Sequence, residues 1–160
     1  MSTDLATIQS LLKTNESIFQ KTIKDIPDEQ WLTQPADGSN HLLWIVAHML
    51  VVRANIPRML GQQWSAPWEK LFARGAERVS GDQYPSPAEL RKAWDEVAAK
   101  MEAGFANVDP EALAEPARQG APSLDGTVAG TLGILCFHET YHVGQLGYLH
   151  KWLGCGQVVG

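Results

Sequence analysis

The chain has 160 residues, of which 44% are apolar and 19% are charged, and its formal net charge is −5. This balance excludes an intrinsically disordered protein, so we expect a single domain over residues 1–160 with a core large enough to fold without disulfides. Acidic and basic residues are mixed along the chain without a basic block, and we therefore expect no nucleic-acid partner.

The sequence shows no sign of a membrane segment or a secretory signal. The longest apolar runs, residues 42–52 and 127–137, are shorter than the roughly 20 residues that span a bilayer. The N-terminus has no basic start followed by an apolar segment. The two cysteines, Cys136 and Cys155, do not have the spacing of a disulfide framework. We therefore predict a cytoplasmic protein without a membrane partner.

A first helix is predicted over residues 4–24. Its apolar residues recur at the three- and four-residue spacing of one helix face. Ser2 or Thr3 is the expected cap, because a side-chain oxygen before the first turn accepts a hydrogen bond from a free backbone N–H group. Pro27 follows and ends the helix.

A second helix is predicted over residues 42–59, with Ser39 or Asn40 as its cap. It is apolar over most of its circumference, which is typical of a buried helix. Pro57 is expected to kink it or to end it early. The connection that follows, residues 61–86, is long enough to run the length of a helical bundle. The second and third helices therefore need not be antiparallel.

The clearest helix start is Ser86-Pro87-Ala88-Glu89, which predicts a capping box with proline at the first helical position. One apolar stripe then runs along the third helix. A fourth helix is predicted over residues 127–154 and ends at Gly154. Because no alternating strand pattern interrupts these segments, we predict an all-α fold, a four-helix bundle with long connections between the helices.

Histidines on the second and fourth helices predict a metal site. His138 and His142 are four residues apart, so they lie about 40° apart on one helix face and roughly 6 Å apart along the axis, close enough for one ion. His41 and His48 are the candidates for a third ligand, and only one can reach the ion because they lie roughly 10 Å apart along the axis. We favour His48, which lies deeper in the apolar run, and we expect His150 on the surface.

Three imidazole ligands favour a divalent metal such as zinc, nickel or iron, and they leave a position open for chemistry. The segment His138-Glu139-x-x-His142 also matches the short pattern of zinc peptidases, in which the glutamate is the general base. Such a peptidase needs an edge strand for its substrate and a third ligand further along the chain, and the sequence suggests neither. Glu139 is therefore a candidate catalytic residue with three open roles: to flank a metal-bound water, to orient a ligand, or to face solvent.

Two motifs, Trp44-x-x-x-His48 and His138-x-x-Tyr141-His142-x-Gly144-Gln145, resemble those of the DinB/YfiT-like superfamily, which includes thiol-dependent transferases and maleylpyruvate isomerases. The resemblance implies a metal site formed by His48, His138 and His142, parallel second and third helices, and a homodimer. It also implies a reaction class, because several relatives use the metal to activate a low-molecular-weight thiol such as bacillithiol or mycothiol.

Several functions are compatible with this pattern. The first is a metal-dependent enzyme, a thiol transferase or hydrolase that acts on a small molecule. The second is a metal-binding or stress-response protein without catalytic activity. A metallopeptidase that uses Glu139 and a bundle with vestigial histidines are further alternatives.

Overall fold

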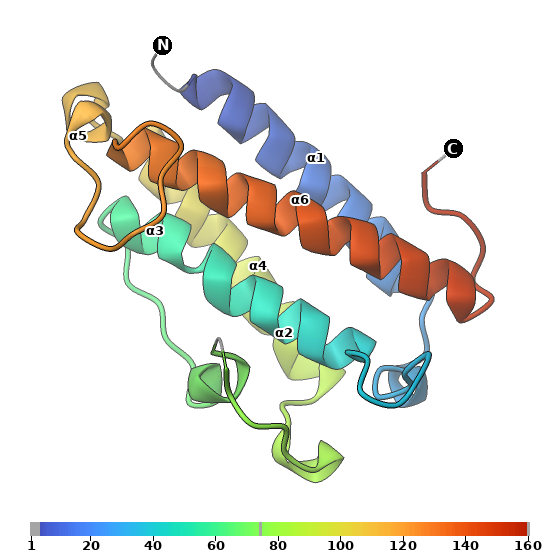
Figure 1. Ribbon diagram of the computed structural model, residues 1–160. Coiled ribbons are helices and arrows are strands. Elements are labelled where there is room, and N and C mark those ends of the chain that lie inside the picture. Colours follow the sequence, from blue (N-terminus) through green and yellow to red (C-terminus); the bar gives the residue numbers. More distant parts are fainter. Residues whose placement is uncertain (1–3, 74, 160) are drawn as a thin grey trace.

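The computed structural model describes residues 4–73 and 75–159. Within these residues the fold is all-α, as predicted: no strand occurs, and an isolated bridge pairs Pro116 with Thr127. The number of helices differs from the expected four, since the described residues form six α-helices and three short 3-10 helices (Figure 1). These are α1 (Leu5–Lys24), η1 (Asp28–Gln30), α2 (Leu42–Arg53), α3 (Asn55–Met59), η2 (Glu69–Phe72), η3 (Gly81–Gln83), α4 (Pro87–Ala106), α5 (Pro110–Ala114) and α6 (Val128–Trp152).

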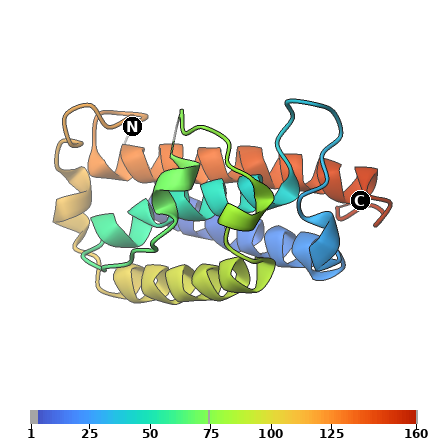
Figure 2. The same cartoon turned by 90° about the horizontal axis from the view of Figure 1, so that it is seen from below.

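The long helices α1, α2, α4 and α6 make up the bundle. α1 and α6 run side by side in one direction, while α2 and α4 run in the opposite direction (Figures 1 and 2). The long connection between α2 and α4, which contains η2 and η3, returns the chain to the end of the bundle at which α2 begins. The second and third long helices are therefore parallel, as the family resemblance implied.

The starts of α1 and α4 are capped by side chains. Asp4 caps α1, because its carboxylate accepts a hydrogen bond from the backbone of the first turn. The expected caps, Ser2 and Thr3, lie outside the described residues. At the start of α4 the predicted capping box of Ser86 and Glu89 is present, with both reciprocal hydrogen bonds.

The start of α2 differs from the prediction. His41 is the cap, not Ser39 or Asn40. Its Nδ1 atom accepts a hydrogen bond from the Trp44 backbone N–H at 3.0 Å, which requires a neutral ring with the proton on Nε2. The imidazole nitrogen therefore does what a serine or aspartate oxygen usually does, satisfying an N–H group that has no partner within the helix.

Pro57 divides the second predicted helix into two. α2 ends at Arg53, and α3 begins at Asn55. Proline has no N–H group, and its ring collides with the carbonyl of the residue four positions earlier, which here is Arg53. The break therefore falls where the proline ring requires it, and the intervening Ala54 keeps helical dihedral angles.

The last long helix, α6, follows its prediction closely. The Thr127 hydroxyl caps it by accepting a hydrogen bond from the Gly130 backbone at 3.0 Å. Gly154 lies just beyond its end with φ +83°, a conformation that favours glycine. The short helix α5 was not expected; Asp109 caps it and Pro110 occupies its first position.

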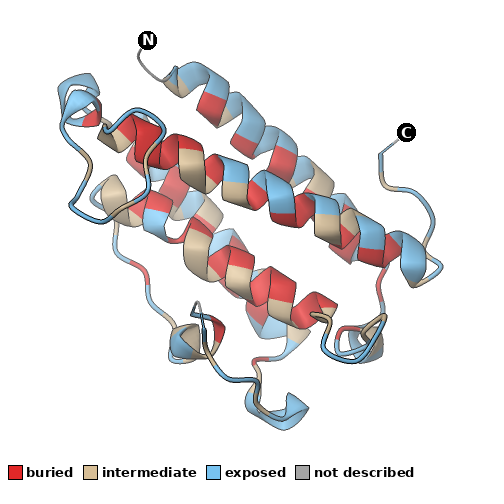
Figure 3. Cartoon of the chain, in the orientation of Figure 1, coloured by how far each residue is buried: buried red, intermediate tan, exposed pale blue. Residues whose placement is uncertain are grey.

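The inward faces of the long helices form the core (Figure 3). One stretch, Leu42–Met59, is long and apolar enough by length and composition to cross a membrane, but 61% of it is buried within the bundle. The core helix of a soluble protein has these properties. The largest fully buried side chains include Trp31, Trp94, Phe19, Phe72, Leu12, Leu42, Met49, Leu50, Ile56, Leu90, Leu132 and Leu146.

Candidate metal centre

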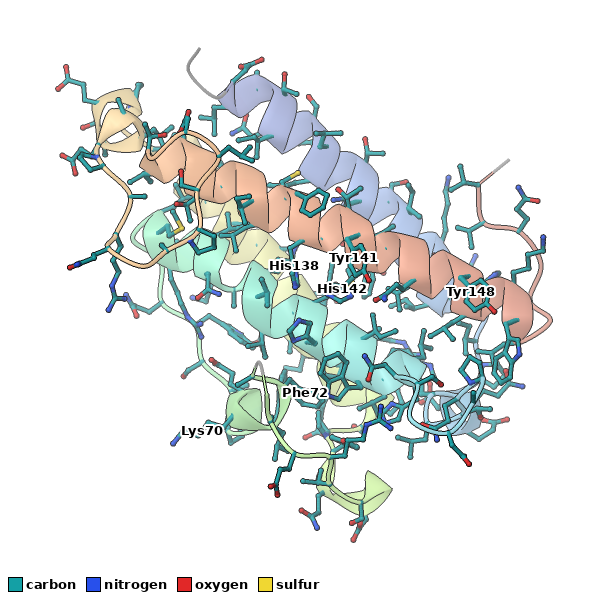
Figure 4. The ribbon with its side chains drawn as sticks, in the orientation of Figure 1. Lys70, Phe72, His138, Tyr141, His142 and Tyr148 are labelled. Atoms are coloured by element: carbon teal, nitrogen blue, oxygen red, sulfur yellow. The ribbon has the colours of Figure 1, made fainter. Side chains whose placement is uncertain are left out.

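Three histidine side chains meet between α2 and α6. His48 comes from α2, and its ligand atom lies close to those of His138 and His142. His138 and His142 come from successive turns of α6 and lie between α6 and α2 (Figure 4). The Nε2 atom of His138 lies 3.1 Å from Nε2 of His48 and 3.1 Å from Nε2 of His142. Among the residues that the structure describes, this is the group whose ligand atoms, all within 4.8 Å of one another, could hold a metal ion.

The ring of His48 is held on two sides. Its Nδ1 atom lies 2.8 Å from the backbone carbonyl of Phe72 in η2, and a carbonyl can only accept, so Nδ1 carries the proton. The indole ring of Trp44, one turn earlier on α2, stacks on the imidazole with ring centroids 4.8 Å apart. These contacts leave Nε2 without a proton and direct it toward α6.

Gln145 orients His142 in the same way. The Nδ1 atom of His142 lies 2.7 Å from the side-chain oxygen of Gln145, so Nδ1 donates and Nε2 keeps its lone pair. The amide nitrogen of Gln145 in turn donates to the Tyr141 hydroxyl at 3.3 Å. The Tyr141 ring also lies edge-on to the His142 ring, with centroids 5.1 Å apart.

The surroundings of His138 and His142 favour the neutral form of their imidazoles. Burial is the main reason that the pKa of His138 falls from 6.5 to about 4, and the neighbouring His142 and His48 lower it further. Burial also lowers the pKa of His142, although the hydrogen bond with Gln145 has the opposite effect and raises it. A neutral imidazole has a nitrogen lone pair to offer a metal ion, whereas a protonated one does not.

This donor set fits a divalent cation. The Nε2 lone pairs of His48 and His142 are both directed at His138, which can donate a proton to only one of them. Nitrogen lone pairs packed this closely repel one another unless a positive charge lies among them. Three neutral imidazoles suit zinc, nickel or iron, and they leave coordination positions for other ligands.

The remaining histidines lie outside this group. His41 caps α2, and its ring meets the Tyr84 ring edge-on at 5.4 Å between centroids. The expectation that His150 lies on the surface is wrong: the residue is only 4% exposed. The turn after α6 brings the Gly156 carbonyl within 3.0 Å of His150 Nδ1, which donates to it. This turn could not be read from the helical spacing alone.

Glu139 is buried and lies outside the histidine group. Its carboxylate accepts a hydrogen bond from the Arg53 guanidinium, with Oε2 and Nη1 2.5 Å apart. Burial raises the pKa of Glu139, and the adjacent Arg53 opposes that effect. Of the three roles considered for Glu139, exposure to solvent is therefore excluded. Its charged partner is the Arg53 guanidinium on α2.

Arg53 connects the long helices, a role that the sequence analysis missed. Its side chain is 1% exposed and binds Glu139 on α6 and Glu16 on α1, each at 2.5 Å. Its guanidinium carbon also lies 4.7 Å from the ring centroid of Trp94 on α4. The sequence held one signal of this role, an arginine at the end of a long apolar run. Such an arginine is expected to be buried, and a buried guanidinium needs carboxylate partners.

A sequence model of the DinB superfamily matches residues 11–146, a segment that contains all three histidines. The chain belongs to the DinB superfamily. The family suggested by the two histidine motifs is therefore confirmed. A search of curated proteins found no match to the chain.

A cavity of about 410 Å³ lies beside two residues that contact His142 in this DinB-superfamily protein, although no histidine lines it. Tyr141 and Gln145 line it and also contact His142, so the cavity and the candidate metal centre share a wall. Ser39 and Asn40, from the segment before α2, and Tyr148 complete its polar lining. None of its lining residues is charged, which suits the uncharged part of a small molecule.

Proposed function

We propose that this DinB-superfamily protein is a metal- and thiol-dependent enzyme, a transferase or hydrolase that acts on a small molecule. The observation that carries the proposal is the convergence of His48, His138 and His142, in which Nε2 of His138 lies 3.1 Å from Nε2 of each of the other two. A divalent metal held there, with zinc, nickel or iron as the proposed ion, supplies a positive charge that lowers the pKa of a coordinated thiol.

The protein's own groups have three tasks in this proposal. The Phe72 carbonyl and Gln145 hold the Nδ1 protons of His48 and His142, so that their Nε2 atoms stay available as ligands. Trp44 covers one face of His48 and limits the access of water to it. The uncharged cavity that begins at Gln145 takes the part of the substrate that does not react.

The thiol reaction is favoured over peptide hydrolysis by the position of Glu139. A peptidase needs a carboxylate free to take a proton from a water molecule, and that of Glu139 is bound to Arg53. A thiol activated by coordination loses its proton without a protein base. The thiol is proposed to be a low-molecular-weight cofactor of the bacillithiol or mycothiol type.

The proposal is tested with the purified protein loaded in turn with zinc, nickel and iron. Low-molecular-weight thiols are combined with chlorodinitrobenzene and other electrophiles, and loss of the free thiol is followed. We expect metal-dependent transfer that is lost in His48→Ala and retained in His41→Asn, which keeps a capping side chain. A protein that binds metal through the three histidines but transfers no thiol to any electrophile would be a non-catalytic metal-binding protein instead.

We also propose that the protein is a homodimer that associates through α6. Phe137, Tyr141 and Tyr148 are 66%, 58% and 66% exposed, and their spacing places them on one face of the helix. Figure 4 shows Tyr141 and Tyr148 along the same side of α6. Exposed aromatic residues gathered in one patch are typical of interaction sites, and a two-fold axis would pair the patch with itself.

A further inference from the structure

A second cavity lies between α1 and α4, and it shares no lining residue with the histidines or with the cavity beside them. α1 packs mainly on α6, while α4 packs mainly on α2 and α3. α1 and α4 also contact each other directly, where Trp94 stacks on Phe19 and donates a hydrogen bond to Glu16. The volume of the cavity is about 350 Å³. A cavity of this size takes a small organic molecule.

The walls of this α1/α4 cavity are apolar. Leu12 on α1 faces it from one side, and Ala98, Met101 and Phe105 line it from α4. The last three residues are spaced three and four apart, so they form a continuous strip along one face of α4. An apolar group of a ligand would be removed from water along this strip.

The floor of the cavity is ionic, and the charge that a ligand would meet there is negative. Arg53 lines the floor, but its side chain is only 1% exposed and its two terminal nitrogens are bound to Glu16 and Glu139. Glu16, in contrast, lines the cavity with a side chain that is 27% exposed. Two carboxylates therefore share one guanidinium, and the more accessible of them faces the cavity.

The charged residues at the mouth of the cavity do not reverse the preference for a cationic ligand. Lys13 on α1 and Glu102 on α4 both line it and carry opposite charges. Both are exposed, so water and salt screen them more strongly than they screen the floor. An anionic ligand would place its charge next to the carboxylate of Glu16, whereas a cationic one would be attracted to it.

We propose that the α1/α4 cavity binds a small amphipathic amine, a primary ammonium group attached to an aromatic or branched apolar group. The Glu16 carboxylate already accepts hydrogen bonds from Arg53, Trp94 and Gln20. The ammonium group is therefore attracted to the partly exposed negative charge of Glu16 and does not depend on an unpaired oxygen. The apolar group contacts Leu12, Met101 and Phe105. This site is separate from the metal centre and does not depend on the reaction proposed there.

Calorimetric titration of the full chain with phenethylammonium chloride tests the proposal. We expect saturable binding at one site, and we expect 3-phenylpropionate, which has a similar shape and the opposite charge, to bind at least about tenfold more weakly. Glu16→Gln should weaken the binding of phenethylammonium about tenfold or more, whereas Glu111→Gln, the same change on the exposed surface of α5, should not. Equal binding of the acid and the amine would overturn the proposal.

Two further variants locate the bound amine. Ala98→Phe fills the cavity from α4 and should abolish binding, while His48→Ala removes a candidate metal ligand and should leave binding unchanged. The reverse result would place the amine at the histidines and contradict the proposal. Circular dichroism identifies any variant that fails to fold. Ala98→Phe and Glu16→Gln test the cavity independently, so unchanged binding of phenethylammonium by either folded variant contradicts the assignment.

Discussion

The Nε2 atoms of His48 and His138 lie 3.1 Å apart, although the two residues are separated by 90 positions in the sequence. The ring of His48 is not free to turn away without loss: the Phe72 carbonyl holds its other nitrogen, and Trp44 stacks on its face. Two imidazole nitrogens directed at one another, with a third from His142 beside them, form an arrangement that a cation stabilises.

The first prediction concerns Glu139→Gln. We expect the variant to keep its metal and most of any thiol-transfer activity, because the carboxylate binds Arg53 and is not one of the candidate ligands. Stability should fall by about 1–3 kcal/mol, since one buried charged hydrogen-bond partner is lost. Metal analysis, a thiol-transfer assay and urea unfolding measure these effects. Metal-dependent hydrolysis of casein by the native protein, lost in this variant, would contradict the prediction.

The second prediction concerns Arg53→Met. The change removes the guanidinium and leaves the carboxylates of Glu16 and Glu139 near one another without a positive partner. We expect the free energy of unfolding to decrease by about 3–5 kcal/mol. Arg53→Lys, which keeps the charge but cannot bind both carboxylates in the same way, should cost less. Equal stability of Arg53→Met and the native protein in urea would show that the ion pairs contribute little.

The third prediction concerns pH and His41. Burial, reinforced by the nearby charge of Arg78, lowers the pKa of His41 below its ordinary value of 6.5. The unfolded chain therefore takes up a proton at a higher pH than the folded chain does. The contribution of His41 to the free energy of unfolding is complete above pH 6.5 and decreases as the pH falls below that value toward the lower pKa of the folded state.

His41→Asn isolates this effect, because asparagine keeps a capping oxygen and does not titrate. Tyr84, which contacts the ring, and Arg78 are unchanged in the variant. Urea unfolding between about pH 7 and about pH 5 should show a weaker pH dependence in the variant than in the native protein. Identical pH dependence in the two proteins would exclude His41 as a source of it.

Much of the fold follows from local patterns in the sequence. Ser86 and Glu89 predict the start of α4 because the capping box involves only the first turn of that helix. His138 and His142 share a helix face because of the helical repeat alone. His48 could be favoured over His41 as the third candidate ligand because it lies further inside an apolar run. Each of these predictions depends on residues close together in the chain.

The features that were missed depend on contacts between distant segments. His150 is buried because the chain turns back after α6 and brings Gly156 to its ring. Arg53 lies between Glu16 and Glu139, 37 and 86 positions away, and no periodic pattern relates these three residues. The tautomer of His48 is set by the carbonyl of Phe72, a backbone group that is the same whatever side chain occupies the position.

The fourth prediction concerns the proposed homodimer. Phe137→Glu places a charge in the exposed aromatic face of α6 and should convert the dimer to a monomer. Leu124→Glu is the matched control, because Leu124 is 61% exposed but lies before α6 rather than on that face. Sedimentation equilibrium at micromolar concentration measures both. A native protein that sediments as a monomer, or a Leu124→Glu variant that dissociates as readily as Phe137→Glu, would contradict this assignment of the interface.

The most direct test of the metal centre is a zinc titration of the native protein and of single histidine variants, in competition with a chelator of known affinity. The native protein should bind one ion per chain, and His48→Ala, His138→Ala and His142→Ala should each weaken binding by at least about 100-fold. His41→Asn should bind as the native protein does, because His41 lies outside the group of ligand atoms. If His48→Ala kept native affinity, or if His41→Asn lost it, the three-histidine centre described here would be wrong.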